Sequence, residues 1–142
     1  MIVIDASIAV KWFIEEADSD TARAILGRHA GEIAVPALFT IEVAAALVRN
    51  GNIHKHATDA MREALLALTE ILAGERMAVM HTSPAQLLVA SQIALNLGHP
   101  LKDCIYLALA MQLDCALVTA DQRFADKAGT ACREVRMLTE SP

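Results

Sequence analysis

The 142-residue sequence lacks the features of several protein classes. Its three cysteines, Cys104, Cys115 and Cys132, are odd in number and form no CxxC pair, which disfavours a disulfide framework and predicts reduced thiols. No run of about 18 apolar residues occurs, so we expect no membrane-spanning helix. No charged leader precedes a long apolar stretch, and we therefore expect a cytoplasmic protein.

The common phosphate-binding and zinc-binding motifs are also missing. There is no GxxxxGK[ST] loop and no GxGxxG after the first apolar run, so nucleotide-binding folds of those types would lack their backbone amides. There is no HExxH motif, and His54 and His56 are two residues apart, a spacing that does not direct both toward one metal on a helix. A zinc site is therefore not expected.

Basic and aromatic residues are scarce. The 12 Lys and Arg residues are outnumbered by 17 Asp and Glu residues. The net charge of −5 argues against nucleic-acid binding through an overall positive charge. Aromatic residues make up only 4%, whereas hydrophobic residues make up 55%, enough to form a sizeable core without a metal or disulfide staple. With no repeat or polar linker, we expect a single domain over residues 1–142.

Short apolar runs alternate with helical patterns along the chain. The runs predict strands at Ile2 to Ile4, Ile33 to Val35, Met77 to Met80, Ala116 to Val118 and Val135 to Leu138. Helices are predicted at Ser7 to Ile14, Ser19 to His29, Ala37 to Asn50, His54 to Leu72, Pro84 to Leu97, Asp103 to Leu113 and Gln122 to Ala128. Strands without polar alternation favour a mainly parallel sheet covered by helices on both faces, an α/β three-layer αβα sandwich.

Four acidic residues lie where this fold would gather them. Right-handed crossovers put the carboxyl ends of all strands on one edge, and Asp5 and Asp121 follow the first and fourth strands. Glu42 and Asp103 lie in otherwise apolar helical segments. Gathered carboxylates repel one another and are normally neutralised by hard cations such as Mg²⁺ or Mn²⁺. The four acids therefore indicate a divalent-metal site.

Each acid also has a plainer interpretation. Asp5 and Asp121 are good helix N-caps after a strand, and Asp103 could simply complement the dipole of its helix. Glu42 stands in a helix that is apolar nearly all round, so it requires either a wet edge or a definite partner. These alternatives remain open at the level of sequence.

The acids and their contexts resemble those of PIN-domain nucleases. Asp5-Ala-Ser, Pro36 followed by Glu42, Lys102-Asp103-Cys104 and Val118-Thr119-Ala120-Asp121 occur in the order of that family, and the resemblance spans the whole chain. Size and element order are similar to the VapC toxins of toxin-antitoxin pairs. The resemblance implies strand order 3-2-1-4-5. It also implies that Asp5, Glu42, Asp103 and Asp121 are metal-coordinating catalytic residues.

The function expected from this resemblance is that of a metal-dependent endoribonuclease, the toxin of a toxin-antitoxin pair, using Mg²⁺ or Mn²⁺ to hydrolyse RNA. The alternative is a non-cleaving PIN-like module that binds a metal or a protein partner. Ser7 and Thr119 each lie two residues from an aspartate and could support a ligand, or could be ordinary capping hydroxyls. Asp126 could add a further acid or face solvent.

Apolar content beyond the needs of one small core predicts a partner. The stretches Ile8 to Ile14 and Ala37 to Val48 suggest surface covered by another chain, so we expect a homodimer. We further expect a cognate antitoxin whose amphipathic segment occupies a groove involving Trp12, Phe13, Leu38 or Phe39.

Overall fold

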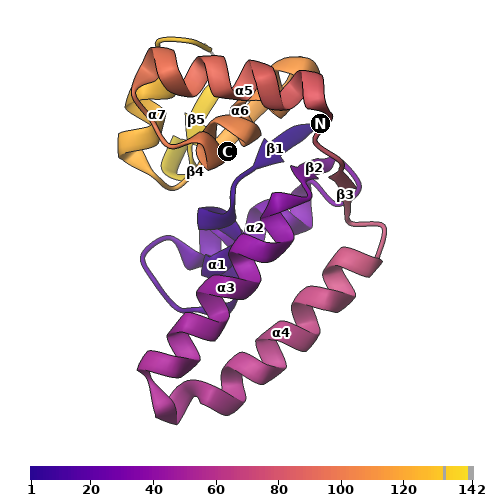
Figure 1. Cartoon of the computed structure of the whole chain (residues 1–142). Coiled ribbons are helices and arrows are strands. Elements are labelled where there is room, and N and C mark those ends of the chain that lie inside the picture. The colour runs from indigo at the N-terminus through magenta and orange to yellow at the C-terminus, as the bar shows by residue number, and fades with distance from the viewer. Residues whose placement is uncertain (133, 141–142) are drawn as a thin grey trace.

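The computed structural model describes residues 1–132 and 134–140, and its centre is a five-stranded sheet (Figure 1). The strands are β1 (Ile2–Ile4), β2 (Ile33–Pro36), β3 (Met77–Met80), β4 (Ala116–Thr119) and β5 (Val135–Met137). They are ordered β3-β2-β1-β4-β5, and every pair is parallel. The carboxyl ends of all five strands therefore share one edge.

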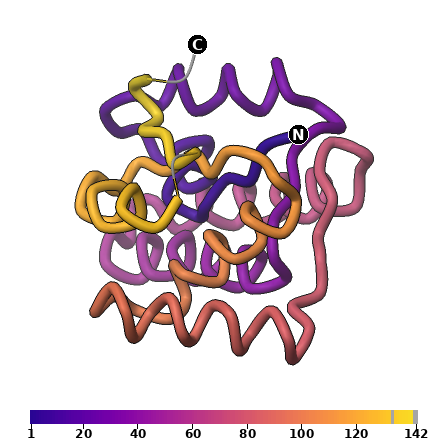
Figure 2. The backbone as a smooth tube through the Cα atoms, turned by 90° about the horizontal axis from the view of Figure 1, so that it is seen from above, coloured from indigo at the N-terminus to yellow at the C-terminus, as the bar shows by residue number. Residues whose placement is uncertain are grey.

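In the described part of the chain, seven α-helices connect the strands. They are α1 (Ala6–Phe13), α2 (Ser19–Arg28), α3 (Leu38–Ile53), α4 (Thr58–Ala73), α5 (Pro84–Leu97), α6 (Leu101–Gln112) and α7 (Gln122–Ala128), with short 3₁₀ turns at Lys55–Ala57 and Leu138–Glu140. Helices α1 and α2 lie on one face of the sheet, and α6, backed by α5, lies on the other (Figure 2). The predicted α/β sandwich and its strand order are confirmed.

The central strands are apolar because the sheet is covered on both faces. All four residues of β2 and all four of β4 are buried, whereas β3 at the sheet edge is partly exposed. This burial pattern explains the absence of polar alternation, since neither face of the central strands meets solvent. Helix α5 begins with a capping box, in which the Ser83 side chain accepts from the Gln86 amide and Gln86 accepts from the Ser83 amide.

Several boundaries differ from the sequence prediction: α3 continues to Ile53 instead of ending at Asn50, and α6 begins at Leu101 instead of Asp103. The helix expected from His54 to Leu72 begins instead at Thr58, because the backbone of His54 leaves the helical region (φ −109°, ψ 84°) and a 3₁₀ turn precedes α4. Leu138, expected to end the last strand, instead begins a 3₁₀ turn and is buried. Antiparallel packing of α3 and α4 gives an arm that extends away from the sheet (Figure 1).

The predicted partner groove is wrong in two of its residues. Trp12 is only 9% exposed and Phe39 is fully buried, and both belong to the main hydrophobic core. The indole N–H of Trp12 donates to the Ala22 carbonyl (3.0 Å), which fixes α1 against α2. The two aromatic side chains hold helices together and offer little surface to another chain.

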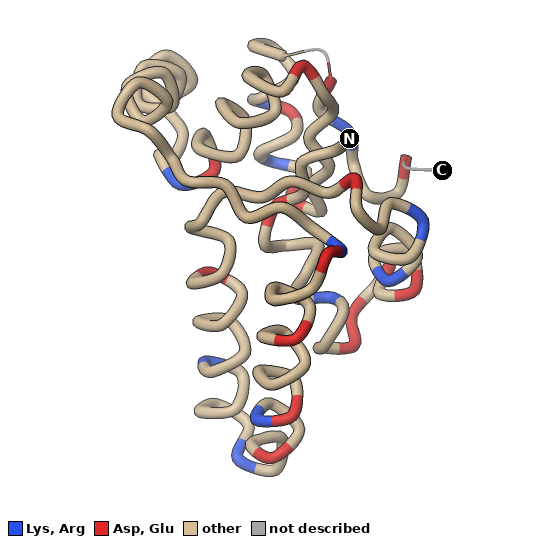
Figure 3. Tube along the Cα trace, turned by 90° about the vertical axis from the view of Figure 1, so that its right-hand side faces the viewer, with Lys and Arg blue, Asp and Glu red and all other residues tan. Residues whose placement is uncertain are grey.

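Acidic and basic positions are interspersed along the described chain (Figure 3).

None of the helices in the described part of the chain is both long enough and apolar enough to cross a membrane.

Two glycines provide a matched test of backbone conformation, and one of them, Gly98, lines the cavity described in the next subsection. Gly98 ends α5 with a left-handed backbone (φ +59°), whereas Gly27 lies inside α2, and a Cβ at either position would meet nothing within 4 Å. Gly98→Ala should therefore lower the free energy of unfolding by about 1 kcal/mol through backbone strain. Gly27→Ala should raise it by about 0.5 to 1 kcal/mol through helix propensity. Urea unfolding of both variants measures the difference, and changes of the same sign would contradict this account.

Candidate metal centre

A cavity of about 550 Å³ lies at the carboxyl edge of the sheet. All four acids singled out in the sequence line it, which are Asp5, Glu42, Asp103 and Asp121. They come from the end of β1, from α3, from the first turn of α6 and from the end of β4. The fold thus brings together four carboxylates that are far apart in the chain.

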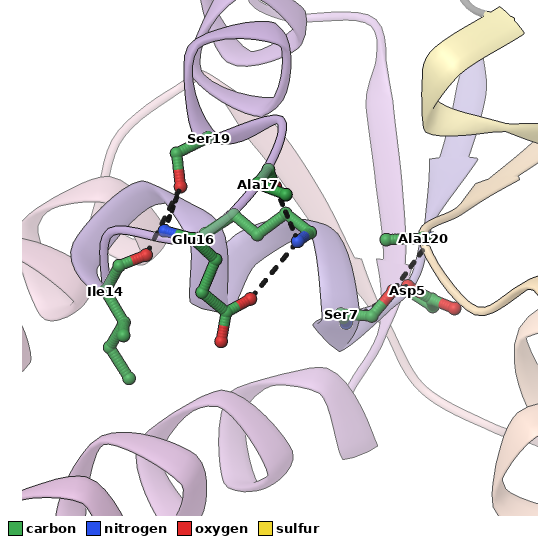
Figure 4. Close-up of polar contacts among 8 residues, drawn as sticks. Asp5, Ser7, Ile14, Glu16, Ala17, Ser19 and Ala120 are labelled. Atoms are coloured by element: carbon green, nitrogen blue, oxygen red, sulfur yellow. Dashed lines mark hydrogen bonds and ion pairs between the residues drawn. The ribbon is translucent and has the colours of Figure 1, made fainter.

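Asp5 is the most buried of the four, with 6% of its surface exposed. One carboxylate oxygen accepts the amide (3.0 Å) and the hydroxyl of Ser7, and the other accepts the hydroxyl of Thr119. The Ser7 hydroxyl also accepts the amide of Ala120 (3.0 Å), linking the ends of β1 and β4 (Figure 4). Burial raises the pKa of Asp5 from 3.8 to about 6 despite these hydrogen bonds, and the charge of Asp103 contributes.

Glu42 has two partners from α6. The hydroxyl of Tyr106 donates to one carboxylate oxygen (2.5 Å), and the ammonium of Lys102 lies 3.2 Å from the other. Burial and the hydrogen bond to Glu42 raise the pKa of Tyr106 well above its usual range, so it stays a donor. Glu42 therefore has the definite partners that a glutamate in the apolar helix α3 requires.

Asp103 is held by a histidine. The Nε2 atom of His99 lies 2.7 Å from a carboxylate oxygen of Asp103, and the imidazole stacks on Phe124 with ring centroids 4.9 Å apart. The His99 side chain is only 7% exposed. Because one ring face packs on Phe124 and one nitrogen contacts Asp103, the imidazole fixes where that carboxylate points.

Asp121 is the most accessible acid of the set. It is exposed and caps α7, with one oxygen accepting the amide of Phe124 (3.0 Å). Its own amide donates to the Thr119 hydroxyl (3.0 Å), the hydroxyl that also contacts Asp5. Asp5 likewise caps α1, so the capping interpretation is confirmed for both aspartates and does not conflict with a place in the cavity.

The remaining candidates divide between the cavity and the surface. Ser7 and Thr119 support Asp5 directly, whereas Asp126 accepts a hydrogen bond from Gln122 and does not line the cavity. Sequence reasoning missed His99 and Tyr106. Tyr106 could have been found, because it is the single tyrosine and lies three residues after Asp103 on the same helix face.

The donor set fits a hard divalent cation by its chemistry, since all four acids offer carboxylate oxygens to one cavity. Among residues 1–132 and 134–140, however, no three acidic, histidine or cysteine side chains already stand in a metal-binding arrangement. The carboxylates instead contact neighbouring hydroxyls, amides, Lys102 and His99. A bound ion would compete with Lys102 for Glu42 and with His99 for Asp103.

Fold and site together define an α/β domain with a carboxylate-lined cavity at the carboxyl edge of a parallel sheet. The chain belongs to the PIN domain family, whose sequence pattern matches residues 2–130. The resemblance drawn from the order of the four acids is thereby confirmed. A comparison with curated proteins gave no match.

Several solved structures share this fold. The protein PAE2754 of Pyrobaculum aerophilum is 18% identical, with a TM-score of 0.71 over 97% of this chain and 89% of that one. VapC20 of Mycobacterium tuberculosis, described as a toxin that cleaves the sarcin-ricin loop, is 14% identical, with a TM-score of 0.68 over 89% and 94% of the two chains. A toxin-antitoxin complex from Klebsiella pneumoniae is 17% identical, with a TM-score of 0.68 over 99% and 100%.

The raised pKa of Asp5 predicts how stability depends on pH. Between pH 3.8 and about 6 the folded protein binds this proton more tightly than the unfolded chain does, so stability falls as pH rises through that window. At about 1.4 kcal/mol for each pKa unit, ionised Asp5 opposes folding by up to about 3 kcal/mol above pH 6. Asp5→Asn should therefore stabilise the protein in EDTA at pH 7.5, by about 1 to 3 kcal/mol, and should remove this slope.

Asp121→Asn is the matched control. Asp121 is exposed and its asparagine replacement can still cap α7, so this variant should change stability by less than about 0.5 kcal/mol. Urea unfolding at pH 5 and pH 7.5 checks both expectations. An Asp5→Asn protein that is less stable than the wild type at pH 7.5 would show that the ionised carboxylate supports the fold.

Proposed function

We propose that the protein is a metal-dependent endoribonuclease that hydrolyses RNA phosphodiester bonds and acts as the toxin of a toxin-antitoxin pair. The observation that carries the proposal is the meeting of four carboxylates in one cavity of a PIN-domain chain. Membership of this family supports a nuclease. The description of VapC20 as a toxin that cleaves the sarcin-ricin loop supports a toxin that acts by cleavage.

Asp5, Glu42, Asp103 and Asp121 would hold one or two Mg²⁺ or Mn²⁺ ions. Such ions supply Lewis-acid activation of water and charge stabilisation at the scissile phosphate. With this chemistry in place, no side chain of the protein has to act as a covalent nucleophile.

The neighbouring side chains orient the acids. The hydroxyls of Ser7 and Thr119 hold Asp5 from both sides, and Tyr106 fixes one oxygen of Glu42 while leaving the other to Lys102. Such supporting hydrogen bonds reduce the number of orientations that a ligand side chain can take. If a cation replaced Lys102 as the partner of Glu42, the Lys102 ammonium would be available to an RNA phosphate at the same cavity.

Removal of one ligand should abolish cleavage. Asp5→Asn and Asp121→Asn should each lower the rate of RNA hydrolysis by at least about 100-fold in the presence of Mg²⁺, because each loses a charged metal ligand. Asp126→Asn is the matched control, since Asp126 faces Gln122 outside the cavity, and it should cleave at the wild-type rate. Incubation with total RNA, followed by mapping of the product ends, measures all three.

EDTA should stop the wild-type reaction. Wild-type rates in either cavity variant, or activity indifferent to the chelator, would contradict the site assignment. Metal binding without any cleavage would favour the non-cleaving module instead.

Exposed apolar side chains support a further proposal, that the protein forms a homodimer through α5. Leu88 and Leu95 lie seven residues apart on one face of that helix and are 60% and 83% exposed. Met111 of the adjacent α6 is also exposed. Isolated domains seldom expose large contiguous apolar patches, so a symmetric pairing of this face is the simplest way to cover it.

A cognate antitoxin is the second proposed partner. The match to a toxin-antitoxin complex from Klebsiella pneumoniae supports this proposal at the level of the fold. With Trp12 and Phe39 in the core, only the partly buried Phe13 and Leu38 of the groove first expected could contact the antitoxin segment.

Light scattering tests the dimer. At tens of micromolar the wild type should give twice the mass of one chain, and Leu95→Glu should give the monomer mass, because the new charge would be buried unpaired at the interface. Leu66→Glu, at an exposed leucine on α4, is the control and should remain dimeric. A wild type with the mass of one chain would overturn the dimer.

A further inference from the structure

A second hollow adjoins the acidic cavity. It has a volume of about 450 Å³ and lies between α1 and α3, helices that pack against each other. Glu42 and Lys102, which form an ion pair, line both the cavity and this hollow, so the two spaces adjoin. A strand of nucleic acid whose phosphate sat among the four acids could therefore extend into it.

One face of α3 forms the first wall. Glu42, Ala45, Ala46, Arg49 and Ile53 follow helical spacing and all line the hollow. The two alanines leave open the space between the acid and the arginine. Glu42 and Arg49 are the only charged residues of α3. This face of the helix therefore carries one carboxylate, at the acidic cavity, and one guanidinium seven residues further along.

The opposite wall comes from α1 and the loop that follows it. Val10 and Ile14 supply apolar surface, and Ile14 and the carboxylate of Glu16 point to the same side of that loop (Figure 4). Glu16 is balanced by Lys11, whose ammonium lies 3.1 Å from it. The carboxylate of Glu16 therefore pairs with Lys11 and not with Arg49.

Arg49 is exposed and makes no ion pair or side-chain hydrogen bond with any residue that the structure describes. His54, whose imidazole is also exposed, lines the hollow beside it. A free guanidinium suits a phosphate, which it can bind through two parallel hydrogen bonds. Apolar side chains and a flat imidazole suit an unstacked base.

We propose that this hollow binds the nucleotide next to the scissile phosphate in single-stranded RNA, with Arg49 on its phosphate and its base against Val10, Ile14 and His54. The inference rests on the proposed nuclease function and assigns the substrate a path out of the acidic cavity. Charge complementarity at Arg49 and the lining residues shared with that cavity carry it.

Two substitutions separate the phosphate contact from the base contact. Arg49→Gln removes the charge, whereas Ala46→Phe fills the hollow without changing charge. Arg76→Gln is the matched control, because Arg76 is also exposed but precedes β3, at the opposite edge of the parallel sheet. All three substitutions are combined with Asp121→Asn, which should prevent cleavage of the RNA during the binding measurement.

Binding is measured by fluorescence anisotropy with a labelled single-stranded RNA of about 12 nucleotides, with Mg²⁺, over a series of salt concentrations. Arg49→Gln should weaken binding about 10-fold and lower the slope of log affinity against log salt by about 0.7, the value for one phosphate contact. Ala46→Phe should weaken binding by a similar factor and leave the slope unchanged. Arg76→Gln should change affinity less than about 2-fold.

The outcomes distinguish this inference from the function on which it rests. If the parent protein binds no RNA and the wild type cleaves none, both proposals are overturned. If the wild type cleaves and the parent binds, but Arg49→Gln and Ala46→Phe bind as tightly as the parent, the hollow is not a nucleotide site although the nuclease stands. Loss of binding to a co-expressed antitoxin, with RNA affinity unchanged, would assign the hollow to the protein partner.

Discussion

The parallel pairing of β1 with β4 determines where this protein can place a polar site. Ile4 lies opposite Val118 in the sheet, and the amide of Asp5 continues the ladder by donating to the Val118 carbonyl (3.3 Å). Both chains leave the sheet at the same edge, where the Thr119 hydroxyl contacts Asp5 and the Asp121 amide. A shift in this register would separate the residues that follow the two strands.

Gathering acids at this edge creates an electrostatic problem, which the fold handles with local partners. The buried carboxylate of Asp5 receives hydroxyl and amide donors, and its pKa is still raised to about 6. Glu42 and Asp103 contact Lys102 and His99. These partners order the carboxylates in the protein itself, and a divalent cation bound among them would neutralise more charge than any one partner does. On the proposed function, cation binding would therefore stabilise the folded protein.

The sheet could be predicted from sequence because each strand is a short apolar run and each helix follows a periodic pattern. The bounds of β1 and β3 agree with their runs because the runs end abruptly at polar residues, Asp5 and His81. Periodicity gave no sign of the break at His54, where the helical pattern continues on both sides of a local change in backbone angles. It also could not show that Trp12 and Phe39 face inward, since both stretches are apolar on several faces.

The candidate site was only partly visible in the sequence. Acids that follow strands can be placed at a sheet edge from the topology alone. Their partners cannot, because the contact between Tyr106 and Glu42 joins residues 64 positions apart. The stacking of His99 on Phe124 depends on how the loop between α5 and α6 lies against α7. These contacts require tertiary packing that no local pattern specifies.

The central claim is that the four carboxylates form one cation site, and calorimetric titration with Mn²⁺ tests it most directly. The wild type should show saturable binding with millimolar or tighter affinity. An Asp5→Asn, Asp121→Asn double variant that remains folded should lose that binding. Equal Mn²⁺ affinity in the wild type and the folded double variant would place any cation elsewhere and contradict the account.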